Sequence, residues 1–259
     1  MIEDFIRDNR SKIDFEWEQL SKQLDSLSQS AKKRMEREEV SFHSDIKLLG
    51  YLSAMLANME GDILEIGIWK GKSLFFMERF SNFGSTIGID PCEFRNQETE
   101  INYFKKSLKS DVHLIQNYSE LALPEVLNAS SGLKLLHIDG GHLEKNVIWD
   151  FLLYSPLITS GGYLVFDDYN DSQFSPEVGP TVDLLKKHGY FRNFQIIGTI
   201  MEFSNSYVLQ KIKKYLRRFL GHDECCQAVN YSNPQKLEVL RFYLPPPRYW
   251  ESSSLPKDC

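Results

Sequence analysis

The chain has 259 residues, of which 42% are hydrophobic and 25% are charged, and its formal net charge is −6 at pH 7. This length can hold one α/β domain with additional segments, and the composition is that of a globular protein. A negative net charge gives no general attraction to nucleic acid or to anionic membranes, so we expect neither as a partner.

The sequence also bears on cellular location. No stretch is long and apolar enough to predict an integral membrane segment, and the acidic start of the chain lacks the apolar core of a signal peptide. The four cysteines form no Cys-x-x-Cys pair, which favours reduced thiols over a disulfide framework or a zinc site. We therefore expect a cytoplasmic protein.

Residues 1–44 predict a helical cap. An apolar side chain recurs every three or four residues, at Trp17, Leu20, Leu24 and Leu27. Such a narrow stripe packs either onto the core of its own chain, which we favour, or onto the same helix of a second copy in a homo-oligomer. A second helix is expected between Ser44, a suitable N-cap, and Gly61.

The segment 62–80 has the pattern of a strand, a glycine turn and a helix, which holds nucleotide-like ligands at the carboxyl edge of a parallel sheet. Only three residues separate Gly67 from Gly71, one too few for a phosphate-binding P-loop. A dinucleotide fingerprint needs glycine where Trp69 stands. What remains, Glu-x-Gly-x-x-x-Gly-x-Ser, resembles motif I of the class I S-adenosylmethionine (SAM) methyltransferases. This resemblance implies SAM-binding roles for Glu65, Gly67, Gly71 and Ser73.

A second strand at 86–89 ends in Asp90. An acid there is placed to accept hydrogen bonds from two ribose hydroxyls, in NAD and SAM folds alike, so it indicates a ribose but leaves the cofactor open. The alternative for Asp90 is a helix N-cap. A third strand precedes Tyr118 and Ser119, which occupy the loop that touches adenine in methyltransferases; plain loop polarity explains them equally well.

Two further strands end in acidic residues. The fourth delivers Asp139, with His142 three places on, and the fifth delivers Asp167 and Asp168. Burying three carboxylates close together is costly unless a cation neutralises them, and hard oxygen ligands suit Mg²⁺. We therefore predict a metal site formed by Asp139, Asp167 and Asp168, which Mn²⁺ or Ca²⁺ would also satisfy. Capping or loop hydrogen bonding is the alternative for any one of them alone.

The motifs become specific in combination. Glu65–Ser73, Asp90, Leu136–His142 and Gly161–Tyr169 together resemble the macrocin O-methyltransferase and cephalosporin-hydroxylase-like group of class I methyltransferases. That group methylates hydroxyls of sugars and natural products with SAM and magnesium, and its metal ligands follow strands four and five. The resemblance covers residues 45–210. It implies a Rossmann-like, seven-stranded, mostly parallel sheet.

The resemblance also assigns chemical roles at the site. In catechol O-methyltransferase, a more distant relative, a lysine three places after the first metal-binding aspartate acts as general base, and here His142 stands at that place. Imidazole titrates near the working pH, so His142 is our candidate base, beside Asp139 as the second catalytic residue. Orienting Asp139 is the alternative role for His142. We also expect Asp139 to contact the cofactor.

The chain after the fifth strand is predicted to close the sheet. Two runs at 194–203 and 207–210 bracket a Ser-Asn-Ser turn and predict an antiparallel hairpin. Residues 211–220 predict a basic amphipathic helix, which leads into an extended tail. The chain thus divides into a cap at 1–44, a SAM-binding methyltransferase core at 45–210 and a C-terminal extension at 211–259.

These patterns predict a SAM-dependent, magnesium-assisted O-methyltransferase that acts on a small polyhydroxylated acceptor, a sugar or glycoside. One alternative is a nicotinamide-dependent oxidoreductase, which explains Asp90 but neither the glycine spacing nor the aspartates. Another is a non-catalytic SAM- or glycan-binding protein with the same fold. A catechol-like or lactam acceptor also stays open.

Overall fold

A computed structural model describes residues 2–32, 45–94, 96–169, 174–188, 190, 193–199 and 225–230. Its strands are β1 (Asp62–Ile66), β2 (Thr86–Ile89), β3 (His113–Ile115), β4 (Leu133–Ile138), β5 (Ile158–Phe166), β6 (Asn193–Thr199) and β7 (Cys225–Asn230). Its helices are α1 (Ile2–Lys32), α2 (Asp45–Met55), α3 (Lys72–Glu78), α4 (Gln97–Leu108), α5 (Ser119–Ala129), α6 (Glu144–Tyr154) and α7 (Val178–Lys187), with a 3₁₀ turn, η1 (Ser155–Leu157).

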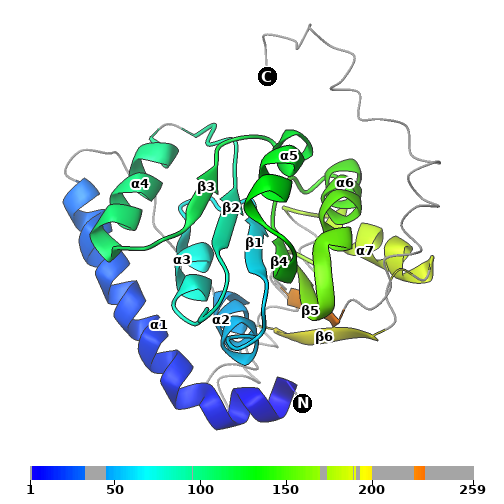
Figure 1. The fold of residues 1–259 in the computed structure, drawn as a ribbon, viewed down its shortest axis with the longest axis horizontal. Helices are drawn as coiled ribbons and strands as arrows, with labels where there is room; N and C mark the ends of the chain where they lie inside the picture. Colours follow the sequence, from blue (N-terminus) through cyan, green and yellow to red (C-terminus); the bar gives the residue numbers. More distant parts are fainter. Residues whose placement is uncertain are drawn as a thin grey trace, which may run out of the picture.

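The first five strands form a parallel sheet in the order β3-β2-β1-β4-β5 (Figure 1). This confirms the α/β, Rossmann-like architecture. Strand β1 pairs with β2 on one side and with β4 on the other, so the chain changes direction across the sheet at β1. Ligands of such sheets bind at the carboxyl ends of the strands that flank this switch point.

The edge beyond β5 differs from the predicted hairpin. Strand β7 runs antiparallel to both β5 and β6, and it lies between them in the sheet. The partner of β6 is therefore Cys225–Asn230, which lies far beyond the nearest turn signal in the sequence. The predicted strand at 207–210, the basic segment 211–220 and the tail after 230 lie outside the described residues.

Each face of the sheet carries its own apolar core, because alternate strand residues point to opposite faces. Leu64, Leu136 and Leu164 face α5, α6 and α7. Ile63, Leu135 and Val165 face α1, α2 and α3. Glu65 and His137 follow two places after Ile63 and Leu135, so these polar side chains belong to the α1–α3 face.

The N-terminal stripe packs within its own chain. Ile13, Trp17, Leu20 and Leu24 are buried against α2 and α3, and the rings of Trp17 and Phe76 meet edge to face at 5.0 Å. Arg79 fixes the outer side by a hydrogen bond of 2.6 Å to Gln23. This packing occupies the stripe that the sequence also offered to a second copy. No helix in the described part of the chain, the 31-residue α1 included, is long and apolar enough to cross a membrane.

Candidate active site

The turn after β1 requires both of its glycines. Gly67 has φ +80°, and a Cβ there would lie 1.9 Å from the carbonyl oxygen of Asp139, so the ends of β1 and β4 can approach only at glycine. Gly71, with φ +77°, opens α3, and Ser73 is half-buried on its first turn. Gly67, in the motif whose spacing excluded a P-loop, thus permits the ends of β1 and β4 to approach closely.

Asp90 stabilises this turn. Its Oδ2 accepts hydrogen bonds from the backbone N–H groups of Ile68 (3.1 Å) and Trp69 (3.0 Å), and its Oδ1 accepts one from Cys92 (2.7 Å). Trp69 itself adopts a left-handed conformation, with φ 45°. A carboxylate offers about four acceptor positions, so these three bonds leave room for one ribose hydroxyl rather than the two expected. The ribose role of Asp90 stays a prediction.

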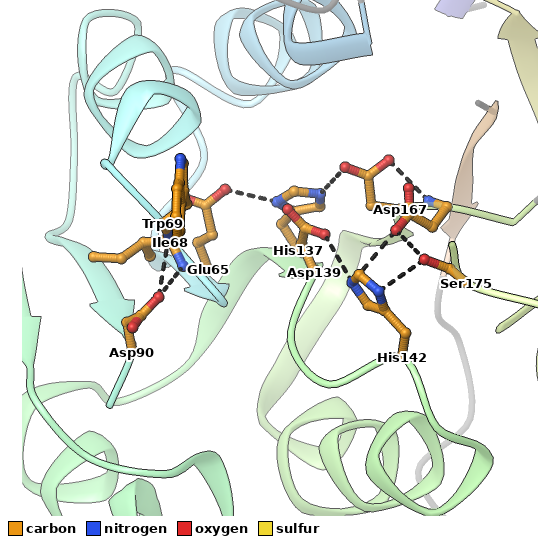
Figure 2. A network of polar contacts seen from close by, with 10 residues as sticks. Glu65, Ile68, Trp69, Asp90, His137, Asp139, His142, Asp167 and Ser175 are labelled. Atoms are coloured by element: carbon orange, nitrogen blue, oxygen red, sulfur yellow. Dashed lines mark hydrogen bonds and ion pairs between the residues drawn. The ribbon is translucent and has the colours of Figure 1, made fainter. Parts of the chain in front are cut away.

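Glu65 forms a buried pair that sequence reasoning missed. Its side chain is 0% exposed and that of His137 is 1% exposed, and 2.8 Å separates Glu65 Oε1 from His137 Nδ1. The other ring nitrogen, Nε2, lies 3.9 Å from Asp167 Oδ2 (Figure 2). Glu65 is therefore enclosed within the protein, two residues before Gly67 of the glycine turn. Its contact with a cofactor stays a prediction. The available signal was a histidine within an apolar strand, two places before Asp139.

The predicted metal ligands divide into two overlapping groups. His137, Asp139 and Asp167 bring one ligand atom each to within 4.8 Å of one another, and so do Asp139, His142 and Asp168. Asp139 is common to both groups, and Asp167 lies toward His137 (Figure 2). Asp168 Oδ2 lies 3.3 Å from His142 Nε2. The predicted set of three aspartates is therefore brought to one edge, and two histidines flank it.

Ser175 fixes the orientation of His142. Its hydroxyl donates to Asp168 Oδ2 at 2.6 Å and lies 2.7 Å from His142 Nδ1. A hydroxyl has one proton, so when Ser175 donates to Asp168 it accepts the N–H of His142 Nδ1. This turns Nε2 of His142 toward Asp168 Oδ2, at 3.3 Å, and Asp139 Oδ1, at 4.0 Å. Ser175 lies in a polar loop, and nothing in its local sequence marked it.

Ser119 links the predicted adenine loop to α6. Its Oγ donates to Asp150 Oδ1 at 2.5 Å, and its carbonyl oxygen accepts a hydrogen bond from the hydroxyl of Tyr154. Burial raises the pKa of Asp150 to about 7, a rise that the Ser119 hydrogen bond limits and nearby Glu120 adds to. A Cβ on Gly140 would lie 2.9 Å from Asp150 Oδ2. Asp150 thus contacts both the predicted adenine loop, through Ser119, and the loop after β4, at Gly140.

Tyr118 lies beside the Asp90 turn. It precedes α5, its side chain is largely exposed, and its hydroxyl donates to Glu93, which follows Asp90 by three residues. The loops after β2 and β3 are thereby joined at the open edge of the sheet. An exposed ring at this position offers a flat apolar surface to a ligand, which agrees with the predicted adenine contact without testing it.

A small pocket, with room for an ion or a water molecule, lies between the loops after β4 and β5 and the start of α7. Its lining combines carboxylates and a histidine with an apolar floor: Ile138, Asp139, Gly140, Gly141, His142, Val147, Phe166, Asp167, Asp168 and Val178. The acids, the candidate base and a concave surface therefore meet at one place. Such convergence of polar groups in a pocket is typical of an active site.

Comparison with known proteins identifies a family for this chain. Residues 64–169 match the family model described as "Methyltransferase domain". Uncharacterized protein R132 of Acanthamoeba polyphaga mimivirus is 35% identical over 150 residues, which cover 55% of this chain and 67% of that protein.

Solved structures share the fold at low sequence identity. An O-methyltransferase from Bacillus cereus in complex with SAH has a TM-score of 0.54 at 15% identity, covering 80% of this chain and 90% of that one. The O-methyltransferase TomG from Streptomyces achromogenes in complex with SAM has a TM-score of 0.53 at 15% identity, covering 81% and 89%. These two matches extend the likeness from the motif region to most of the chain.

Proposed function

Because this chain belongs to the class I methyltransferases, we propose that it transfers the methyl group of SAM to a hydroxyl of a small polyhydroxylated acceptor, a sugar or glycoside, with the help of a divalent cation. The observation that carries this proposal is the position of His142. Its Nε2 faces Asp139 and Asp168 at the same sheet edge as the glycine turn. His142 would therefore accept a proton next to the expected cofactor site.

The cofactor would bind across the switch point between β1 and β4. The glycine turn would border the methionine part, Asp90 would offer its remaining acceptor position to a ribose hydroxyl, and Tyr118 with Ser119 would border the adenine. These groups come from the ends of neighbouring parallel strands, which is where cofactors of this fold class bind. Solved relatives of the same fold carry SAM or SAH.

The donor set of the site fits a divalent cation. Asp139, Asp167 and Asp168 would hold it, since their carboxylates converge from β4 and β5 and hard oxygen ligands suit such ions. When bound, the ion supplies Lewis-acid chemistry that lowers the pKa of an acceptor hydroxyl. Such an ion could also hold two neighbouring hydroxyls, which, together with the resemblance to sugar-methylating enzymes, favours a polyhydroxylated acceptor.

The residues of the chain would then move the proton. As the acceptor oxygen forms its bond to the methyl carbon, the carbon–sulfur bond breaks and the hydroxyl proton passes to His142 Nε2. Ser175 accepts the Nδ1 hydrogen of His142 and so keeps Nε2 free to receive that proton. Asp168, 3.3 Å from Nε2, stabilises the imidazolium that results. Positioning supplies the rest, because the sulfonium is already a good methyl donor.

Calorimetric titration of the full-length protein with SAH and with NAD tests the cofactor. Stoichiometric SAH binding without NAD binding is the expected result. NAD binding alone would overturn the proposal in favour of an oxidoreductase. Labelled SAM with a panel of sugars and catechols then tests catalysis: Asp167→Ala should abolish transfer while SAH binding persists. If the wild-type protein binds SAH but methylates none of the panel, a non-catalytic SAM-binding role replaces the enzyme.

A further inference from the structure

We propose that His137 is a metal ligand through Nε2, together with Asp139 and Asp167, and that the site therefore prefers a transition-metal ion such as Mn²⁺, Fe²⁺ or Co²⁺ to Mg²⁺. This inference rests on the metal-assisted function proposed above and changes both its ligand set and its ion. His137 belongs to neither the expected cofactor site nor the predicted aspartate set.

Strand register places the ligands in one row. Glu65 on β1 stands opposite His137 on β4, which stands opposite Val165 on β5. Residues two apart share a face of the sheet, so Asp139 follows His137 and Asp167 follows Val165 on that same face. Backbone hydrogen bonds from Asp139 to Ile66 and from Asp167 to Ile138 continue the ladder to these positions. A carboxylate, an imidazole and two further carboxylates are thus aligned by the sheet itself.

Glu65 sets the tautomer of His137. Its Oε1, 2.8 Å from Nδ1, is an acceptor, so in the neutral ring the hydrogen sits on Nδ1 and the lone pair sits on Nε2. Histidines that bind metals are commonly held in this way, with a carboxylate on the far ring nitrogen that fixes the ring and raises its basicity. Glu65 is fully buried, and its role is therefore to hold the ring rather than to meet solvent or substrate.

The spacing around Nε2 fits shared coordination. It lies 3.9 Å from Asp167 Oδ2, beyond hydrogen-bond length. Two ligand atoms that each lie about 2.1 Å from one ion are separated by roughly 3.0 Å at a right angle and by roughly 4.2 Å when opposite. The observed separation falls within this interval. The competing arrangement is a metal-free imidazolium held between Glu65 and Asp167, and the experiment must separate the two.

The nitrogen ligand decides the preferred ion. Mg²⁺ takes oxygen ligands and retains water, whereas imidazole suits first-row transition metals, whose affinities for such sites exceed that of Mg²⁺. A site with only the three aspartates would suit Mg²⁺, Ca²⁺ and Mn²⁺. The two ligand sets therefore differ most in their affinity for the later ions, Fe²⁺ and Co²⁺.

Pulsed electron paramagnetic resonance on the Mn²⁺-loaded full-length protein tests the ligand directly. We expect a ¹⁴N coupling from a coordinated imidazole, lost in His137→Gln and kept in His142→Gln. His113→Gln is the matched control, since His113 lies on β3 and forms an exposed ion pair with Glu125. Absence of the coupling in the wild-type protein would overturn the proposal and leave the imidazolium arrangement. Loss of it in His142→Gln alone would move the ion to the other group.

A second variant guards against misfolding of His137→Gln. Glu65→Gln keeps the size of the side chain, and calorimetry should show Mn²⁺ affinity reduced by about 10–100-fold, as for other residues that hold a metal-binding histidine. Mg²⁺ affinity of the wild-type protein should be weaker than its Mn²⁺ affinity. Equal affinities for the two ions, or an unchanged Mn²⁺ affinity in Glu65→Gln with native circular dichroism, would contradict the proposal.

The outcome is separable from that of the proposed function. SAH binding without added metal reports on the cofactor site alone. If SAH binds and sugars are methylated but no nitrogen coupling appears, the methyltransferase proposal stands and the ligand proposal fails. If nitrogen-coordinated Mn²⁺ is seen but SAH does not bind, the metal site stands without the transferase chemistry.

Discussion

The two halves of the carboxyl edge satisfy their polar groups in different ways. Around β1 and β2, the carboxylate of Asp90 accepts three hydrogen bonds from backbone N–H groups, two in the glycine turn and one at Cys92. Around β4 and β5, Asp139, Asp167 and Asp168 face one another and two histidines. The first half is therefore preorganised by hydrogen bonds between the Asp90 carboxylate and the backbone. The second half brings together like charges that only a proton or a cation can balance.

This contrast separates binding from chemistry. A turn fixed by backbone bonds can hold a cofactor in one geometry without any charge change. A cluster of carboxylates and imidazoles can take up and release protons and metal ions, which the proposed reaction requires. Variants around β1 and β2 should therefore lower cofactor affinity and stability. Variants around β4 and β5 should instead lower turnover.

The largest expected effect is on turnover. His142→Ala should lower kcat by about 10²–10⁴-fold, the usual contribution of a positioned general base, while SAH affinity stays unchanged. Labelled methyl transfer and calorimetry measure the two quantities. His188→Ala, an exposed histidine that follows α7, is the control. A kcat within a few-fold of wild type would assign His142 to the orientation of Asp139 instead.

Asp150 joins the two halves, because it bonds Ser119 and packs behind Gly140. Burial raises its pKa to about 7, above the value of about 4 for an unfolded aspartate. The folded state then holds the extra proton between pH 4 and pH 7, so this group stabilises the fold fully below pH 4 and that contribution is lost as the pH rises through 7.

Asp150→Asn isolates this effect. The slope should be about 1.4 kcal/mol of unfolding free energy per pH unit between pH 4 and pH 7, and the variant should lack it, because Asn cannot ionise. Urea unfolding at pH 5 and pH 7 measures the difference between the two proteins. Parallel pH dependence of wild type and variant would show that Asp150 does not take up a proton on folding.

The sequence predicted those features of the site that depend on local patterns and on the order of the elements. The glycine spacing identified the turn, because positive φ and a 1.9 Å approach to Asp139 permit only glycine at position 67. The three aspartates were found because strand ends of a parallel sheet meet at one edge. These features depend on local geometry and on the order of the elements, and both are readable from one chain.

Other features depend on contacts between distant segments. Ser175 reaches His142 across 33 positions, and β6 pairs with a strand 26 or more residues past its own end. His137 was hidden because one histidine in an apolar run also fits an ordinary buried core position. Its partner, Glu65, is set by the register of β1 against β4, which local patterns do not specify.

Gly67→Ala tests the preorganised half. The new methyl group would meet backbone atoms of the loop after β4, which cannot rotate away, and φ +80° is strained for alanine. We expect a loss of about 1–3 kcal/mol in stability and loss of SAH binding. Gly161→Ala is the matched control: its φ is +88°, but a Cβ there meets only the end of Met59 at 3.8 Å. Equal effects of both variants would reduce the role of Gly67 to backbone strain.

Ser175→Ala gives the smallest expected effect and tests the side-chain half. The variant removes the acceptor for the Nδ1 hydrogen of His142, so neither the orientation of the ring nor the tautomer with a free Nε2 is favoured any longer. Loss of one hydrogen bond of about 1 kcal/mol should lower kcat by roughly five- to ten-fold, with the KM for SAM unchanged. Ser81→Ala is the control, because the exposed hydroxyl of Ser81 donates to the nearby carbonyl of Phe83. A raised KM for SAM instead would mean that Ser175 shapes the cofactor site, and the two halves of the edge would then be coupled rather than independent.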